Sequence, residues 1–134
     1  MLASKIYTSF KGRLFLLGFG CIGQAILPLI LRHIALSLEQ ITIISAREEE
    51  RETAESYGIN FIHYALTPEN CRSFWKNFLS QGDFLVNVSA DIASVDLIEV
   101  CLECNVLYLD TSNEPWLGGC TDPNVTLAER SCYA

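Results

Sequence analysis

The sequence predicts an α/β domain that is doubly wound around a mainly parallel sheet of five or more strands. Short apolar runs alternate with longer segments whose apolar residues recur at helical spacing. Strands joined by helices of this length need crossover connections, and such connections place neighbouring strands in parallel. Half of the 134 residues are hydrophobic and 19% are charged, which is the balance of a chain that folds around a core.

Two strand–helix units are expected in the first half of the chain. Residues 14–17 form an apolar run between two glycines and predict a strand that is buried on both faces. A helix is expected from Cys21, and Pro28 inside it predicts a kink. Residues 41–44 are all β-branched and predict the second strand, whereas residues 48–57 predict a charged helix closed by a glycine.

The second half repeats this alternation and then loses it. Residues 61–64 predict the third strand, and Thr67 followed by Pro68 predicts a helix with the threonine as its N-cap. The next strand, helix and strand are expected at residues 83–88, 92–103 and 106–109. After Asp110, turn-forming residues replace the alternation. We therefore expect residues 1–134 to form one domain that is truncated at Ala134.

A glycine motif lies between the first predicted strand and the first predicted helix. The segment Gly18-Phe19-Gly20-Cys21-Ile22-Gly23 fits the pattern G-x-G-x-x-G. In such a turn the first glycine permits the bend, the second lets a pyrophosphate approach the backbone, and the third allows close helix–strand packing. The N-terminus of the helix then favours the anion. The motif predicts a dinucleotide-binding Rossmann domain whose cofactor-binding residues include Gly18, Gly20, Cys21, Ile22 and Gly23.

The second part of this fingerprint is irregular. An acidic residue about 20 positions beyond the glycines usually binds the ribose 2′-hydroxyl, yet the second strand ends in Ser45-Ala46-Arg47-Glu48. We expect Ser45 to contact the ribose and Arg47 to stack on adenine or meet a 2′-phosphate, with Glu48 as another candidate for the ribose. A solvated first helical turn explains Arg47 and Glu48 equally well. These residues leave both NAD and NADP open.

Polar residues also follow the fourth and fifth predicted strands, where ligands of open α/β sheets bind. Asn87, Ser89 and Asp91 follow the fourth strand. Caps and turns explain single members of this group equally well. After the fifth strand, Glu114 lies two positions before Trp116, and an acid beside an indole suits a cationic amine. Packing of Trp116 in a domain interface is the alternative.

Composition argues against several classes of protein. A net charge of −7 opposes binding to nucleic acid or to anionic membranes. The apolar segments are too short to cross a bilayer, and no signal peptide is evident, so we expect a cytoplasmic protein. The six cysteines predict reduced thiols. Cys101 and Cys104 form C-x-x-C without a second pair or a nearby histidine, which favours core packing over a metal site.

Several segments together resemble the N-terminal domain of bacterial homospermidine synthases, relatives of saccharopine dehydrogenase. The resemblance extends from about Gly12 to the last residue. The segments that carry it are Gly12-Arg13-Leu14, the glycine motif with Gln24, Leu27-Pro28-Leu29-Ile30, Asn87-Val88-Ser89, Leu107-Tyr108-Leu109-Asp110-Thr111 and Glu114-Pro115-Trp116. The glycine motif is generic, but Leu27-Pro28-Leu29-Ile30 and Glu114-Pro115-Trp116 in register with it are specific.

The resemblance implies a transferase of polyamine biosynthesis that joins putrescine units into homospermidine. NAD accepts a hydride from the amine, the imine exchanges amines, and the hydride returns. The resemblance also implies that Glu114 is catalytic and holds an ammonium group beside Trp116, and that Asn87, Ser89 and Asp91 line the nicotinamide side.

The resemblance further implies a second domain that carries much of the substrate pocket, so the catalytic and substrate domain is absent from residues 1–134. For the full-length protein we expect a homo-oligomer acting on putrescine or a related polyamine, and for the isolated chain cofactor binding without turnover. Two alternatives stay open. One is a saccharopine dehydrogenase-like oxidoreductase that reduces a different imine. The other is a non-catalytic NAD-binding module.

Overall fold

The structure, a computed structural model, describes residues 5–130 and confirms the predicted fold class. Five strands form one sheet in the order β5-β4-β2-β6-β7, and all neighbouring strands are parallel. The strands are β2 (Leu14–Leu17), β4 (Ile41–Ser45), β5 (Asn60–His63), β6 (Phe84–Asn87) and β7 (Leu107–Asp110). Each lies within one residue of its predicted position. The strand order reverses beside the first strand of the sheet, β2, which is the point where such folds bind ligands.

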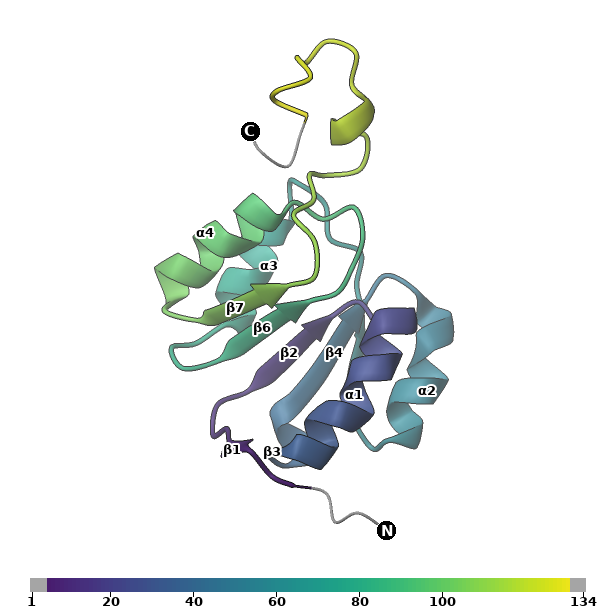
Figure 1. The fold of residues 1–134 in the computed structure, drawn as a ribbon, viewed down its shortest axis with the longest axis vertical. Coiled ribbons are helices and arrows are strands. Elements are labelled where there is room, and N and C mark those ends of the chain that lie inside the picture. Colours follow the sequence, from purple (N-terminus) through teal and green to yellow (C-terminus); the bar gives the residue numbers. More distant parts are fainter. Residues whose placement is uncertain (1–4, 131–134) are drawn as a thin grey trace.

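Helices cover both faces of this sheet (Figure 1). They are α1 (Cys21–His33), α2 (Arg51–Ser56), α3 (Cys71–Phe78) and α4 (Ser94–Cys104). Alternate residues of β2 belong to two core clusters on opposite faces of the sheet, because successive side chains of a strand point to opposite faces. Leu14 and Leu16 pack in the cluster that contains residues of α1 and α2, whereas Phe15 and Leu17 pack in the cluster formed with α3 and α4.

Two of the predicted helices differ from expectation in their bounds. The helix expected to begin at Thr67–Pro68 begins only at Cys71, so that start was wrong. The Thr67 N–H donates to Asn70 Oδ1 at 2.8 Å and the Asn70 N–H donates to Thr67 Oγ1 at 3.3 Å, and this exchange closes a separate turn before the helix. The charged helix is split into a 3₁₀ turn, η2 (Glu48–Glu50), and α2.

Short elements that the sequence did not predict surround the main sheet. Near the N-terminus β1 (Thr8–Ser9) pairs in parallel with β3 (Ile34–Ala35), which follows α1 directly. A 3₁₀ turn, η1 (Leu38–Gln40), leads into β4. Past β7, the described residues form turns and one 3₁₀ turn, η3 (Gly119–Thr121). Between residues 5 and 130, no helix combines the length and apolar character needed to cross a membrane.

An ion pair between a half-exposed arginine and a buried aspartate joins the starts of two central strands. Asp83, which is 4% exposed, lies just before β6, and its Oδ2 lies 2.6 Å from Nη2 of Arg13, just before β2. The Arg13 backbone N–H and Nε also donate to Oδ1, and the Ser80 N–H donates to Oδ2. These bonds satisfy the buried carboxylate and fix the central strands that carry the ligand-binding end of the sheet.

Candidate functional site

A cleft of about 710 Å³ lies at the carboxyl ends of the central strands. Its walls are formed by the glycine turn after β2, the end of β4, the segment after β5, the loop after β6, and Trp116 and Leu117 in the segment after β7. Seven of the residues predicted for the site line it: Gly18, Gly20, Ser45, Arg47, Ser89, Asp91 and Trp116. Cys21, Ile22, Gly23, Asn87 and Glu114 lie outside this lining. The cleft has the size and place expected of a ligand site in this fold.

The three glycines of the motif have different reasons to be glycine. Gly18 has a φ of +87°, and a Cβ there would lie 2.9 Å from backbone atoms of Ser89. A Cβ on Gly23 would lie 2.7 Å from the Gly18 carbonyl oxygen. Gly20 has φ −71° and ψ −156°, which other residues adopt, and a Cβ there would meet only Glu50 Oε1 at 3.9 Å. The protein's own packing therefore requires the first and third glycines but not Gly20.

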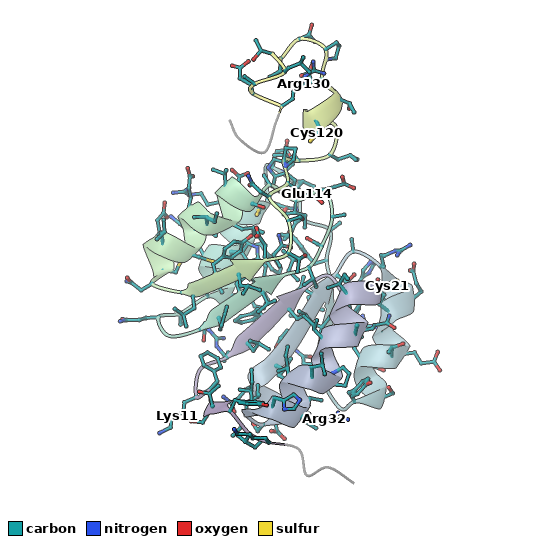
Figure 2. The ribbon with its side chains drawn as sticks, in the orientation of Figure 1. Lys11, Cys21, Arg32, Glu114, Cys120 and Arg130 are labelled. Carbon is teal, nitrogen blue, oxygen red and sulfur yellow. The ribbon has the colours of Figure 1, made fainter. Side chains whose placement is uncertain are left out.

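The open backbone at Gly20 adjoins the N-terminus of α1. Gly20 is the N-cap residue, and within residues 5–130 no side-chain capping hydrogen bond is made at this position. Peptide N–H groups and the helix dipole favour an anion at such a place. Cys21 is exposed in the first turn (Figure 2), next to this position. The arrangement suits an anionic group that lies against the backbone.

On the β4 side of the cleft, a serine and a glutamate form one hydrogen-bonded unit. Ser45 Oγ donates to Glu50 Oε2 at 2.6 Å and accepts the Arg47 N–H at 3.1 Å. The Glu50 side chain is only 6% exposed, and Glu50 lines the cleft with Ser45. The Arg47 guanidinium is 68% exposed and pairs with Glu49 at 3.2 Å and with Glu50 at 3.9 Å. Ser45 stands at the end of β4, where an acidic residue was expected, and Glu50 of η2 brings a carboxylate to the same place.

Glu48 does not take this position. Its carboxylate pairs with Arg51 and lies 3.3 Å from His63 Nδ1, outside the cleft lining. The hydrogen bond from Arg51 lowers the pKa of Glu48. Sequence reasoning therefore missed Glu50, which lies 27 positions beyond Gly23 rather than about 20. Glu50 is the last of three consecutive glutamates, and nothing in the sequence distinguishes it from the other two.

On the β6 side, Asn87 organises the end of the strand from a buried position. Its Oδ1 accepts hydrogen bonds from the backbone N–H and the hydroxyl of Ser89, at 3.1 and 2.5 Å. Its Nδ2 donates to the Tyr108 hydroxyl at 3.4 Å, and that hydroxyl donates to Asp110 Oδ2 at 2.9 Å. Burial raises the pKa of Tyr108, so the phenol stays protonated as a donor. Asn87 therefore positions Ser89, which reaches the cleft.

Glu114 joins the loop after β6 to the segment after β7. Its Oε2 accepts the Asp91 N–H at 2.8 Å and its Oε1 accepts the Ser112 hydroxyl at 3.1 Å. Its backbone N–H and carbonyl both bond to Ser94 at the start of α4. Asp91 has a positive φ of 64° and does not cap α4, whose N-cap is Ala93. Figure 2 shows Glu114 in the segment that leaves the sheet near α4.

Trp116 separates the main cleft from a smaller cavity. Its Nε1 donates to Asp96 Oδ2 at 2.6 Å, and its ring packs against the core cluster beneath α4. The smaller cavity, of about 270 Å³, is lined by Glu114 and also by Trp116 and Arg130. Glu114 and Trp116 thus both line the smaller cavity, and Trp116 also lines the main cleft, whereas Glu114 does not. Among the described residues, no cluster of three potential metal ligands occurs.

The cysteines of α3 and α4 belong to the core. Cys71 and Cys101 are each 1% exposed, and the five cysteines that the structure describes are free thiols. Cys132 lies outside the described residues. Burial raises the pKa of Cys71 to about 11 and that of Cys101 to about 12. Cys71 and Cys101 are therefore packed thiols of the core.

Thiol labelling of the native chain at pH 8 is expected to spare Cys71 and Cys101. A raised pKa keeps a thiol protonated, so roughly one in 10³ or fewer of these groups is thiolate at that pH. Cys21 and Cys120 are exposed and are expected to react first with iodoacetamide, as mass spectrometry of the peptides will show. In urea all of them should react. Early labelling of Cys101 in the native chain would contradict its core position.

Comparison with known proteins agrees with the glycine turn and the fold. A family model described as "Saccharopine dehydrogenase NADP binding domain" matches residues 14–134. The chain is 39% identical over 132 residues to a homospermidine synthase of Blastochloris viridis and 37% identical over 132 residues to one of Mesorhizobium japonicum. These alignments cover 96% of this chain but 28% and 27% of the two relatives. The predicted resemblance is confirmed.

A solved structure gives the same result in three dimensions. The crystal structure of a homospermidine synthase from Legionella pneumophila in complex with NAD superposes with a TM-score of 0.81 and 37% sequence identity, over 94% of this chain and 27% of that one. The chain thus spans a little more than a quarter of the length of these relatives. On the fold, the glycine turn and the match to residues 14–134, the chain belongs to the saccharopine dehydrogenase NADP-binding domain family.

Proposed function

We propose that residues 1–134 form the NAD-binding domain of a homospermidine synthase. The observation that carries this proposal is Gly20, which borders the cleft at a helix N-terminus although no contact within residues 5–130 requires a glycine there. A pyrophosphate that approaches the backbone explains the missing side chain. The similarity to homospermidine synthases, one of them solved with NAD, supports the same cofactor.

The residues around the cleft fit the parts of a dinucleotide. The backbone from Gly18 through Cys21 to Ile22 would hold the pyrophosphate, while Gly23 keeps α1 close enough for that contact. Ser45 and Arg47 would lie on the adenosine side. The volume of about 710 Å³ falls within the usual range for cofactor sites.

Polar residues at the end of β6 would border the nicotinamide. Ser89 and Asp91 line the cleft there, and Asn87 holds Ser89 in place. When bound, NAD supplies the reversible acceptance and return of a hydride that joining two putrescine units requires. The residues of this chain would orient the ring and exclude water from it.

Glu114 is proposed to hold an ammonium group of the diamine, with Trp116 beside it. Each oxygen of a carboxylate offers two acceptor positions. The bonds from Asp91 and Ser112 therefore leave each oxygen of Glu114 one position for an ammonium. Glu114 is half-buried and lines the smaller cavity, and its carboxylate accepts the N–H of Asp91, which lines the main cleft. A charge held there places the amine near the end of β6, where hydride transfer is proposed.

Substitution of Glu114 by glutamine tests this role. In the full-length protein saturated with NAD, Glu114→Gln is expected to weaken putrescine binding by about 10-fold or more, because a charge-assisted hydrogen bond is lost. Glutamine still accepts the Asp91 N–H, so the affinity for NAD should change less than about twofold. Isothermal titration calorimetry measures both affinities.

The matched control for this experiment is Glu99→Gln. Glu99 is an exposed carboxylate of α4, pairs with Arg72 and lines neither cavity. It should leave both affinities unchanged. Equal putrescine binding by the wild type and Glu114→Gln would reduce Glu114 to a residue that only positions the loop around Asp91.

The division of labour between domains is also a proposal. Since the relatives are several times longer, we propose that much of the substrate pocket lies in a second domain and that residues 1–134 alone bind NAD without turnover. Free thiols fit a cytoplasmic enzyme. A homo-oligomer is proposed for the complete enzyme. Homospermidine formed from putrescine and NAD by this chain alone would refute the division.

A further inference from the structure

We propose that Glu50, positioned by Ser45, is the acid that binds the adenosine ribose of NAD and excludes the 2′-phosphate of NADP. This inference rests on the proposed cofactor-binding function and adds to it the residue that selects the cofactor. The family model takes its name from NADP, whereas the solved relative contains NAD. The choice between the two therefore has to be read from the residues of this chain.

The geometry places the Glu50 carboxylate beside the pyrophosphate turn. Its Oε1 is the one atom within 4 Å of a Cβ built on Gly20, at 3.9 Å, and its Oε2 accepts the Ser45 hydroxyl at 2.6 Å. Ser45 is the last residue of β4, where the acid of a regular fingerprint would stand. A short side chain at that position leaves room for the longer acid from η2 to fill the same space.

Burial makes this carboxylate unusual among those of η2. Glu50 is 6% exposed in the wall of the cleft, although burying a carboxylate is costly. Glu49 is 70% exposed and Glu48 is 53% exposed, and neither lines the cleft. Of these three acids, Glu50 alone can accept hydrogen bonds from ribose hydroxyls within the cleft.

The charges around this position favour NAD. Residues 47–50 contain one arginine and three glutamates, so the segment has an excess of negative charge. Arg47, which would otherwise neutralise a 2′-phosphate, already pairs with Glu49 and lies 3.9 Å from Glu50. A 2′-phosphate beside the buried carboxylate would meet a like charge at low dielectric, which costs affinity.

The test compares NAD and NADP binding by the 134-residue chain using isothermal titration calorimetry. The wild type should prefer NAD. Glu50→Gln should weaken NAD by about 10-fold or more and reduce the NAD-over-NADP preference by at least the same factor, because a charged acceptor is lost and the repulsion disappears. Glu55→Gln is the matched control. Glu55 is an exposed carboxylate of α2 that pairs with Arg51 at 3.5 Å rather than with Arg47, and it does not line the cleft. Its neutralisation should leave the preference within about twofold.

A second variant covers the case in which Glu50→Gln does not fold. Glu50→Asp keeps the charge but withdraws it by one methylene, so NAD should bind more weakly while NADP stays excluded. Thermal unfolding checks that each variant is folded. If the wild type binds neither cofactor, the proposed function itself fails. If the wild type binds NAD but the folded Glu50 variants keep its affinity and preference, this inference is overturned and the proposed function stands.

Discussion

Gly20→Ala is expected to lower the affinity for NAD by about 10- to 100-fold while the free energy of unfolding changes by less than about 1 kcal/mol. In the protein itself the new methyl group meets only Glu50 Oε1, at 3.9 Å, and the backbone at φ −71° accepts any residue. The small loss of a preferred N-cap glycine is offset by the reduced entropy of the unfolded chain. Only a pyrophosphate lying against the backbone would be displaced.

Two measurements on the same protein separate these effects. Isothermal titration calorimetry gives the affinity for NAD, and urea unfolding gives the free energy of unfolding. A Gly20→Ala chain that binds NAD as tightly as the wild type would show that no ligand approaches this part of the backbone. The cofactor would then have to lie elsewhere.

Gly23→Ala is expected to have the opposite profile, destabilising the fold by about 2 to 3 kcal/mol. A Cβ on Gly23 would lie 2.7 Å from the Gly18 carbonyl oxygen and 3.2 Å from Phe19 Cδ2. Phe19 is fully buried and Gly18 is held in a left-handed turn, so neither can yield without disturbing the start of α1.

Urea unfolding of Gly23→Ala next to Gly20→Ala provides the comparison, since both variants make the same chemical change within one motif. The loss of stability in Gly23→Ala should lower the urea concentration at the midpoint of unfolding and leave the dependence of the unfolding free energy on urea nearly unchanged. Equal stability of the two variants would mean that the turn can widen, and the assignment of Gly23 to helix–strand packing would be wrong.

Local patterns predicted the strands well because each central strand is buried on both faces. The apolar run of β2 and the β-branched run of β4 permit few other structures, and each strand begins and ends within one residue of its prediction. The start of α3 was less predictable. Thr67 is a typical N-cap residue, but here it exchanges hydrogen bonds with Asn70 in a separate turn before the helix. These bonds depend on the rotamer of the Asn70 side chain, which the sequence does not reveal.

The site was predictable where function depends on the backbone. The glycine turn is a local pattern, whereas the position of Glu50 depends on η2 folding back onto the end of β4. Likewise, the pairing of Glu114 with the Asp91 N–H joins residues 23 positions apart. A sequence-spacing rule cannot predict this contact, because tertiary packing brings the two loops together.

The most direct test of the central claim, that the glycine turn receives the diphosphate of NAD, is an NMR titration of the ¹⁵N-labelled chain with NAD. Saturable shifts of the amide signals are expected at Gly18, Gly20 and Cys21, with smaller shifts at Ser45 and Ser89 around the same cleft. Shifts confined to the cavity beside Arg130, or no saturable shift at the glycine turn, would contradict the account.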